Sequence, residues 1–352
     1  MATPAAAPAG GRAPAADAPV AGRVPAPPPA VRPAAADVGA RGGPRPVVLD
    51  CDPGHDDALA ITLALARPEL RVLGITTVGG NSPLANTTRN ALRVLALLDR
   101  DDVPVAAGAE RALLREPWTP VEFHGASGLD GADLPEPRMA PRAEGALALT
   151  EALIAASDRP VTLVATGPLT NVALLLRARP RIHEEIERIC LMGGSLGAGN
   201  TTASAEFNAW QDPEAAAIVL GSGIPVSMMG LDVTHRALFL EPDVARLDAL
   251  GTRLGRVWAD LLRFFAAYHR RRYGWDGSPI HDAVAVAHLA VPGLVTTELL
   301  RVDVETAGDL TRGRTVADRE GLRGLPANVE AGVDIDRGRF VDLLVEAIAA
   351  SG

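Results

Sequence analysis

The chain contains no lysine: all 34 positions that carry either lysine or arginine are arginine. This absence excludes Schiff-base chemistry, pyridoxal phosphate attachment and a standard phosphate-binding loop. Cysteine is almost as scarce, and Cys51 and Cys190 each lie in an apolar, strand-like segment. We therefore expect two buried thiols and no disulfide scaffold. No apolar run approaches the roughly 18 residues of a membrane span, so we expect no membrane partner.

Acidic residues outnumber basic residues by 43 to 34, so the formal net charge is −9. The one basic run is Arg270-Arg271-Arg272. This balance argues against nucleic acid or an anionic membrane surface as the main partner. Aromatic residues make up only 3% of the chain against 47% hydrophobic residues, so alanine, leucine and valine must fill the core.

Residues 1–44 consist largely of alanine, proline, glycine and arginine. Such a segment buries too little apolar surface to offset its ordering entropy, and we predict a disordered extension. It also lacks the continuous apolar core of a secretory signal, which favours a cytoplasmic location. The remaining residues, 45–352, are predicted to form one large domain.

Strand-like and helix-like runs alternate from residue 45 onward. This alternation predicts an α/β fold, with a mostly parallel, Rossmann-like central sheet flanked by helices. Strands are expected over 47–50, 70–78, 103–105, 161–165, 189–192 and 226–231. Helices are expected after the turn at 53–54 and over 84–98, 145–156, 171–177 and 213–220. Ligands of such sheets bind at the carboxyl ends of the strands.

Four carboxylates follow the first strand within eight residues: Asp50, Asp52, Asp56 and Asp57. Two unit charges about 4 Å apart repel by roughly 4 kcal/mol near a protein surface, and capping a helix needs only one acid. We therefore expect a cation among them, and oxygen ligands favour calcium or magnesium over zinc. The alternative is a capped helix with a solvated acidic turn.

Further polar residues follow later strands or open later helices. Asn200, Glu206 and Asn208 could hold the hydroxyl groups of a sugar, although a solvated loop would use the same residues. Thr166 follows a strand within a Thr-Gly-Pro turn, which turn chemistry alone also explains. Asp282 begins a helix as Asp57 does, so the two helices could direct acids at one cation, or Asp282 could simply stabilise its helix.

The motif Asp50-x-Asp52-Pro53-Gly54-x-Asp56-Asp57 resembles the N-terminal signature of the calcium-dependent, inosine–uridine-preferring nucleoside hydrolases, and later motifs of that family follow in order. The resemblance implies a calcium ion held by Asp52, Asp57, the main-chain carbonyl of Thr166 and Asp282. It also implies Asp52 as the general base that takes a proton from a metal-bound water.

The same resemblance implies the substrate-binding residues. Those expected to contact the ribonucleoside are Asp56, Asn81, His124, Met192, Asn200, Glu206, Phe207 and Asn208. His281 is the expected acid for the departing base. Tyr268, Tyr273 and Trp275 could stack on that base or have a structural or exposed role, and His124 could also be a plain surface histidine. Members of the family also imply a homodimer or homotetramer.

The sequence therefore predicts calcium-dependent hydrolysis of the N-glycosidic bond of purine or pyrimidine ribonucleosides, which yields ribose and a free base. One alternative is a phosphatase of the haloacid-dehalogenase type, because Asp50-x-Asp52 after an apolar strand resembles its start. That chemistry usually needs a lysine, which is absent here. The other alternative is a nucleoside-binding protein without turnover.

Overall fold

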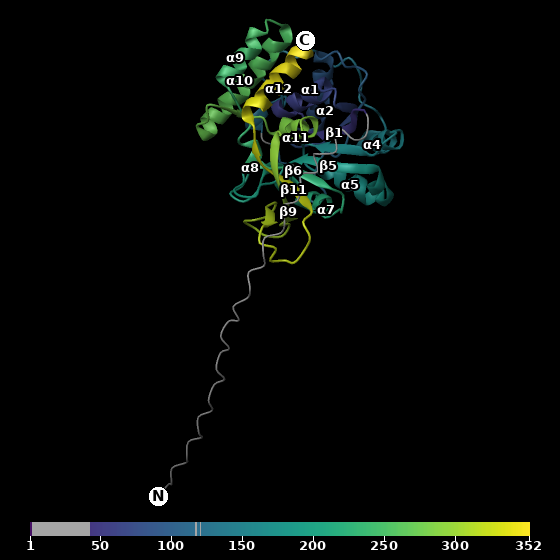
Figure 1. Ribbon diagram of the computed structural model, residues 1–352, viewed down its shortest axis with the longest axis vertical. Coiled ribbons are helices and arrows are strands. Elements are labelled where there is room, and N and C mark those ends of the chain that lie inside the picture. The colour runs from purple at the N-terminus through teal and green to yellow at the C-terminus, as the bar shows by residue number, and fades with distance from the viewer. Residues whose placement is uncertain (2–42, 117, 120) are drawn as a thin grey trace.

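A nine-stranded sheet runs through the molecule, with its strands in the order β10-β9-β11-β6-β5-β4-β1-β2-β3 (Figure 1). The computed structural model describes Met1 and residues 43–352, apart from positions 117 and 120. The predicted extension, residues 1–44, lies outside the described residues except at Met1, Gly43 and Pro44.

Seven neighbouring strands of the described sheet are parallel. They are β3 (Val105–Ala107), β2 (Leu70–Thr77), β1 (Arg45–Cys51), β4 (Val161–Ala165), β5 (Ile186–Met192), β6 (Val226–Met229) and β11 (Val329–Ile335). The antiparallel strands β9 (Val295–Val304) and β10 (Thr315–Asp318) extend one edge. A separate two-stranded sheet pairs β7 (Leu238–Leu240) with β8 (Gly277–Pro279). The predicted α/β fold with a mostly parallel sheet is confirmed.

Helices cover both faces of this sheet, and the side chains of each strand alternate between the two cores. In β1, Val47 and Leu49 belong to one core and Val48 to the other, as the two-residue period of a strand requires. The first core is covered by α1 (His55–Ala66), α2 (Leu84–Leu97), α9 (Glu241–Ala249), α10 (Arg253–Tyr273), α11 (His281–Ala290) and α12 (Arg337–Ala350). The second is covered by α4 (Gly145–Ala155), α5 (Thr170–Ala178), η2 (Pro180–Glu185) and α7 (Pro213–Leu220).

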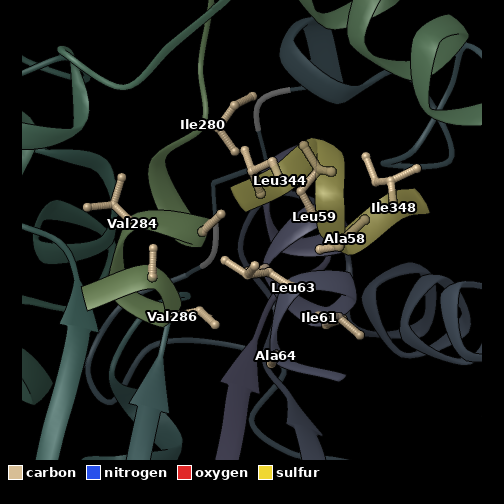
Figure 2. Packing of buried hydrophobic residues seen from close by; sticks show 14 of the residues in the cluster. Ala58, Leu59, Ile61, Leu63, Ala64, Ile280, Val284, Val286, Leu344 and Ile348 are labelled. Atoms are coloured by element: carbon tan, nitrogen blue, oxygen red, sulfur yellow. The ribbon is translucent and has the colours of Figure 1, made fainter. Parts of the chain in front are cut away.

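Helix α1 is buried on every side from His55 to Ala64, which suits its almost continuous apolar sequence. Figure 2 shows Leu59 of α1 beside Leu344 of α12, and both belong to the core cluster that also contains Leu63 of α1 and Val284 of α11. Because α1 packs against α11, their amino-terminal turns, each carrying acidic residues, come together at one end of the sheet.

The bounds predicted for strands and helices lie within two residues of the observed ones, except that β5 begins at Ile186 and not at 189. The strand expected over 103–105 is shifted by two residues. It runs from Val105 to Ala107, because Pro104 has no N–H and contributes only its carbonyl, which accepts from the Ile75 amide at 2.9 Å. The strand expected over 226–231 ends at Met229, since α8 (Leu231–Thr234) begins after Gly230. In the described part of the chain, no helix is both long enough and apolar enough to span a membrane.

Candidate active site

A cavity of about 280 Å³ lies at the carboxyl ends of the parallel strands. Asn81 follows β2, Thr166 follows β4, and Met192 ends β5, so three neighbouring regions of the sheet contribute to its wall. The predicted site residues that line it are Asp56, Asn81, His124, Thr166, Met192, Asn200, Glu206, Phe207, Asn208, His281 and Asp282. The other two, Asp52 and Asp57, are fully buried and contact Asn81 and Thr166 of the wall.

Three buried carboxylates gather where α1 meets α11. Ligand oxygens of Asp56, Asp57 and Asp282 all lie within 4.8 Å of one another. Burial raises the pKa of Asp282 well above its usual range, and the neighbouring Asp56 and Asp57 raise it further. Burial, together with Asp57, also raises the pKa of Asp56 to about 7. The sequence predicts that Asp56 contacts ribose. The structure also places it beside the predicted calcium ligands Asp57 and Asp282.

Asp52 lies in a cradle made by two glycines. Its Oδ2 accepts from the Asn81 amide at 2.7 Å, while its buried Oδ1 has no hydrogen-bond partner among the described residues. A Cβ on Gly80 would lie 2.1 Å from Asp52 Oδ2, and one on Gly167 would lie 2.7 Å from Oδ1. Any larger residue at either position would displace the carboxylate.

Asn81 and Thr166 connect the acids. The side-chain amide of Asn81 donates to Asp57 Oδ2 at 3.1 Å, in addition to its backbone contact with Asp52. The Thr166 hydroxyl donates to Asp57 Oδ1 at 2.8 Å, and its main-chain carbonyl accepts from Asn208 Nδ2 at 2.7 Å. Thr166 therefore contacts one predicted ligand through its side chain and faces the cavity.

These residues fit a hard divalent cation. Adjacent buried carboxylates cannot all be ionised unless an opposite charge lies between them. The donors are all oxygen atoms, which calcium and magnesium prefer, and the unpaired Oδ1 of Asp52 has no other described partner. A capped helix with a solvated acidic turn does not account for this arrangement, because Asp52, Asp56 and Asp57 are at most 5% exposed.

Asp50, the first acid of the motif, does not line the cavity. Its Oδ1 accepts from Thr76 Oγ1 at 2.6 Å and from Asn171 Nδ2 at 2.7 Å, between β2 and α5. Burial raises its pKa to about 6, and these two hydrogen bonds oppose the rise. Asp50 therefore supports the turn from within the protein.

Glu206 and Asn208 also line the cavity, and hydrogen bonds to the backbone set their orientation. Glu206 caps α6 (Phe207–Gln211) and accepts from the amides of Gly194, Asn208 and Ala209 at 2.8, 3.0 and 3.1 Å. The Asn208 amide group donates to the carbonyls of Thr166 and Met192. Both donors of Asn208 are thus engaged, which leaves its Oδ1 to accept from a ligand.

The other end of the cavity is aromatic and rich in histidine. Residues from α10 and the segment after it supply Phe265, His269, Tyr273 and Trp275. Of the three aromatics expected to stack on a base, Tyr273 and Trp275 line the cavity, whereas Tyr268 does not and packs on Phe123 at 4.3 Å between ring centroids.

His281 and His124 stand on this side as neutral rings. Burial lowers the pKa of each well below its usual value, and neighbouring histidines lower it further. His281 Nδ1 lies 2.7 Å from Thr234 Oγ1. His124 Nδ1 lies 3.0 Å from Nδ1 of His55, whose Nε2 is 2.7 Å from the Asp130 carbonyl.

Six residues that line the cavity are not predicted from the sequence: Phe123, Gly199, Thr201, His235, Phe265 and His269. The spacing of Phe265, His269 and Tyr273 at intervals of four residues was the available signal, because such residues share one face of a helix. That spacing predicts a shared face but does not say what the face contacts.

The comparisons with known proteins agree with this geometry. The model of the family described as "Inosine-uridine preferring nucleoside hydrolase" matches residues 47–342. A "Pyrimidine-specific ribonucleoside hydrolase RihA" from Shewanella sp. (strain ANA-3) is 51% identical over 306 residues, covering 87% of this chain and 96% of the relative. The protein of the same name from Enterobacter sp. (strain 638) is 51% identical over 305 residues, covering 86% and 97%.

Solved structures give the same result. A "Purine-Preferring Ribonucleoside Hydrolase from Gardnerella vaginalis" superposes with a TM-score of 0.82 at 34% identity, covering 87% of this chain and 99% of that one. The phosphatase alternative is therefore set aside. The chain belongs to the family of inosine-uridine preferring nucleoside hydrolases, enzymes that hydrolyse the N-glycosidic bond of ribonucleosides.

Proposed function

We propose that this enzyme hydrolyses pyrimidine ribonucleosides to ribose and free base with calcium as its cofactor. The observation that carries the proposal is the group formed by Asp56, Asp57 and Asp282, because two of these acids line the same cavity as the oxygen acceptors Glu206 and Asn208. The pyrimidine preference is supported by relatives that are 51% identical and named pyrimidine-specific.

Calcium would be held by Asp52, Asp57, Asp282 and the Thr166 carbonyl, with Asp56 beside it. Bound there, it would lower the pKa of a water molecule and hold two hydroxyl groups of the sugar. Asp52 is the proposed general base: its Asn81 contact fixes the carboxylate, and the unpaired Oδ1 is free to take the proton of the attacking water. Proton transfer of this kind contributes roughly 10²- to 10⁴-fold to rate.

The remaining residues orient the sugar and the base. Asp56, Asn200, Glu206 and Asn208 would hold the ribose hydroxyls, which places the anomeric carbon next to the water. As water oxygen bonds to that carbon, the bond to the base nitrogen breaks, and the transition state has oxocarbenium character. His281, the expected acid for the departing base, is a neutral ring, so it would stabilise that base through an N–H hydrogen bond as negative charge develops on it.

The direct test is release of ribose from uridine, cytidine and inosine, measured with added calcium and after chelation. We expect calcium-dependent release that is faster from the two pyrimidine nucleosides. Absence of ribose release from every nucleoside would refute the proposed activity, and equal rates with and without chelator would refute the cofactor.

Other properties remain predictions. We propose residues 45–352 as the catalytic domain and residues 1–44 as an extension outside the chemistry, so deletion of residues 2–42 is expected to leave kcat/KM unchanged. A homodimer or homotetramer, a cytoplasmic location and no nucleic-acid or membrane partner are expected from the family and the composition.

A further inference from the structure

One ring nitrogen of His269 is engaged by no described residue. It lies at the aromatic, histidine-rich end of the cavity, which we call the base end because we place the nucleobase there. The side chain is 4% exposed and lines the cavity. Its ring is stacked with Trp275 at 5.9 Å between centroids and meets Phe265 edge-on at 4.5 Å. These contacts hold the ring in one orientation.

The hydrogen bonding of the ring fixes its tautomer. Nδ1 lies 3.1 Å from the Phe265 carbonyl, and because a carbonyl can only accept, Nδ1 must carry the hydrogen. Burial lowers the pKa of His269 to about 4, so the ring is neutral at physiological pH. Nε2 is therefore bare and can only accept a hydrogen bond.

This bare nitrogen has no protein partner to satisfy it. Nε2 makes no hydrogen bond with the described residues and is not sealed away from the cavity. A bound ligand that turns an N–H toward it would supply the missing donor. A ligand without such a donor would leave a buried acceptor unpaired, which disfavours its binding.

We propose, on the basis of the proposed function, that His269 Nε2 is a specificity-determining acceptor for the nucleobase, and that in uridine it receives the N3–H of uracil. Ribose would be held at the end of the cavity that carries Asp56 and Asp282, which we call the acid end, and the base would then extend toward the rings of α10. Once N1 is bonded to the sugar, N3–H is the only ring N–H of uracil. Removing this one hydrogen therefore tests whether His269 recognises the base.

The test compares uridine with 3-methyluridine, in which a methyl group replaces the N3 hydrogen. The full chain with calcium is assayed for kcat/KM as wild type, His269→Phe and His269→Gln. Phenylalanine keeps a ring but cannot accept, whereas glutamine keeps an acceptor oxygen. His183→Phe on η2 is the matched control, because His183 is outside the cavity.

We expect wild type and His183→Phe to favour uridine by roughly 10- to 100-fold, since the methylated base leaves Nε2 unpaired. His269→Phe should reduce this ratio to within about threefold, and His269→Gln should retain part of it. A wild type that cleaves both nucleosides equally would overturn the proposal. A preference that persists in His269→Phe would also overturn it, because the methyl group would then be rejected by its size.

Two failures remain distinguishable. If wild type releases no ribose from uridine, the proposed function fails and not merely the role of His269. If His269→Phe does not fold, as judged by circular dichroism, His269→Leu takes its place, because leucine also cannot accept a hydrogen bond, and the same two results for its ratio support or overturn the proposal.

Discussion

The two ends of the cavity are built in different ways. At the acid end, turns after parallel strands and the first turns of α1 and α11 supply the side chains, and hydrogen bonds such as Asn81 to Asp52 orient them. At the base end, α10 supplies rings that pack on rings, such as Phe265 on His269. The topology of the sheet thus positions the side chains where we place bond cleavage. The packing of one helix positions the side chains where we place recognition of the nucleobase.

The largest expected effect comes from the acid end. Asp52→Asn should lower kcat/KM for uridine by roughly 10²- to 10⁴-fold, because an amide cannot act as the base. Circular dichroism should show a native fold. Asp102→Asn, an exposed surface acid paired with Arg100, is the matched control and should change nothing. Activity close to wild type in Asp52→Asn would show that another group takes the proton.

A smaller loss should follow when Asp52 is kept but moved. Gly80→Ala would place a Cβ 2.1 Å from Asp52 Oδ2, so the carboxylate must shift. We expect a loss of about 10²-fold in kcat/KM, since misplacement of about 1 Å can cost that much. Gly223→Ala is the control, because a Cβ at that position would meet nothing within 4 Å. Its φ of +83° adds backbone strain, so this variant can lose stability, but its kcat/KM should stay unchanged. An unaffected Gly80→Ala enzyme would contradict the proposed cradle.

At the base end, Phe265→Leu should weaken binding of nucleosides without affecting ribose. The ring stacks on His124 at 5.2 Å, and an aromatic contact of this kind contributes about 0.5–1.5 kcal/mol, so we expect a loss of roughly 2- to 12-fold in kcat/KM. The inhibition constant of free ribose should stay unchanged, because ribose occupies the acid end. The adjacent Phe264→Leu, outside the cavity, is the control. An equal loss of ribose affinity would show that the two ends are not separate.

The smallest expected effect is on thermal stability. Calcium at 100 times its dissociation constant should stabilise the wild type by about 2.7 kcal/mol, and Asp282→Asn should remove most of this gain. Without calcium, Asp282→Asn should melt no lower than the wild type, because it relieves repulsion among buried acids. Differential scanning calorimetry measures both. A calcium-dependent shift of normal size in Asp282→Asn would remove Asp282 from the ligands.

The contrast between the two ends explains what the sequence could predict. The strands, the helices between them and the acids at strand ends follow from local periodicity, and parallel strands bring such ends to one edge. That is why Asn81, Thr166 and Met192, far apart in the chain, were expected together. The contact of Asp56 with the sugar stays a prediction, whereas its position next to Asp57 and Asp282 could not be derived, because spacing alone does not resolve which oxygen of adjacent acids faces inward.

The base end could not be derived in the same way. His269 and Phe265 lie on a 21-residue helix whose position depends on packing against α9, α12 and β8, which sequence periodicity does not specify. The tautomer of His269 depends on a contact with the Phe265 carbonyl that only the folded structure shows.

The central claim is that a calcium ion lies between the first turns of α1 and α11. A crystal structure of the enzyme grown with calcium tests it most directly. We predict an ion with oxygen atoms of Asp57 and Asp282 at about 2.3–2.6 Å. Well-ordered side chains of both residues with no ion between them, at saturating calcium, would contradict the account.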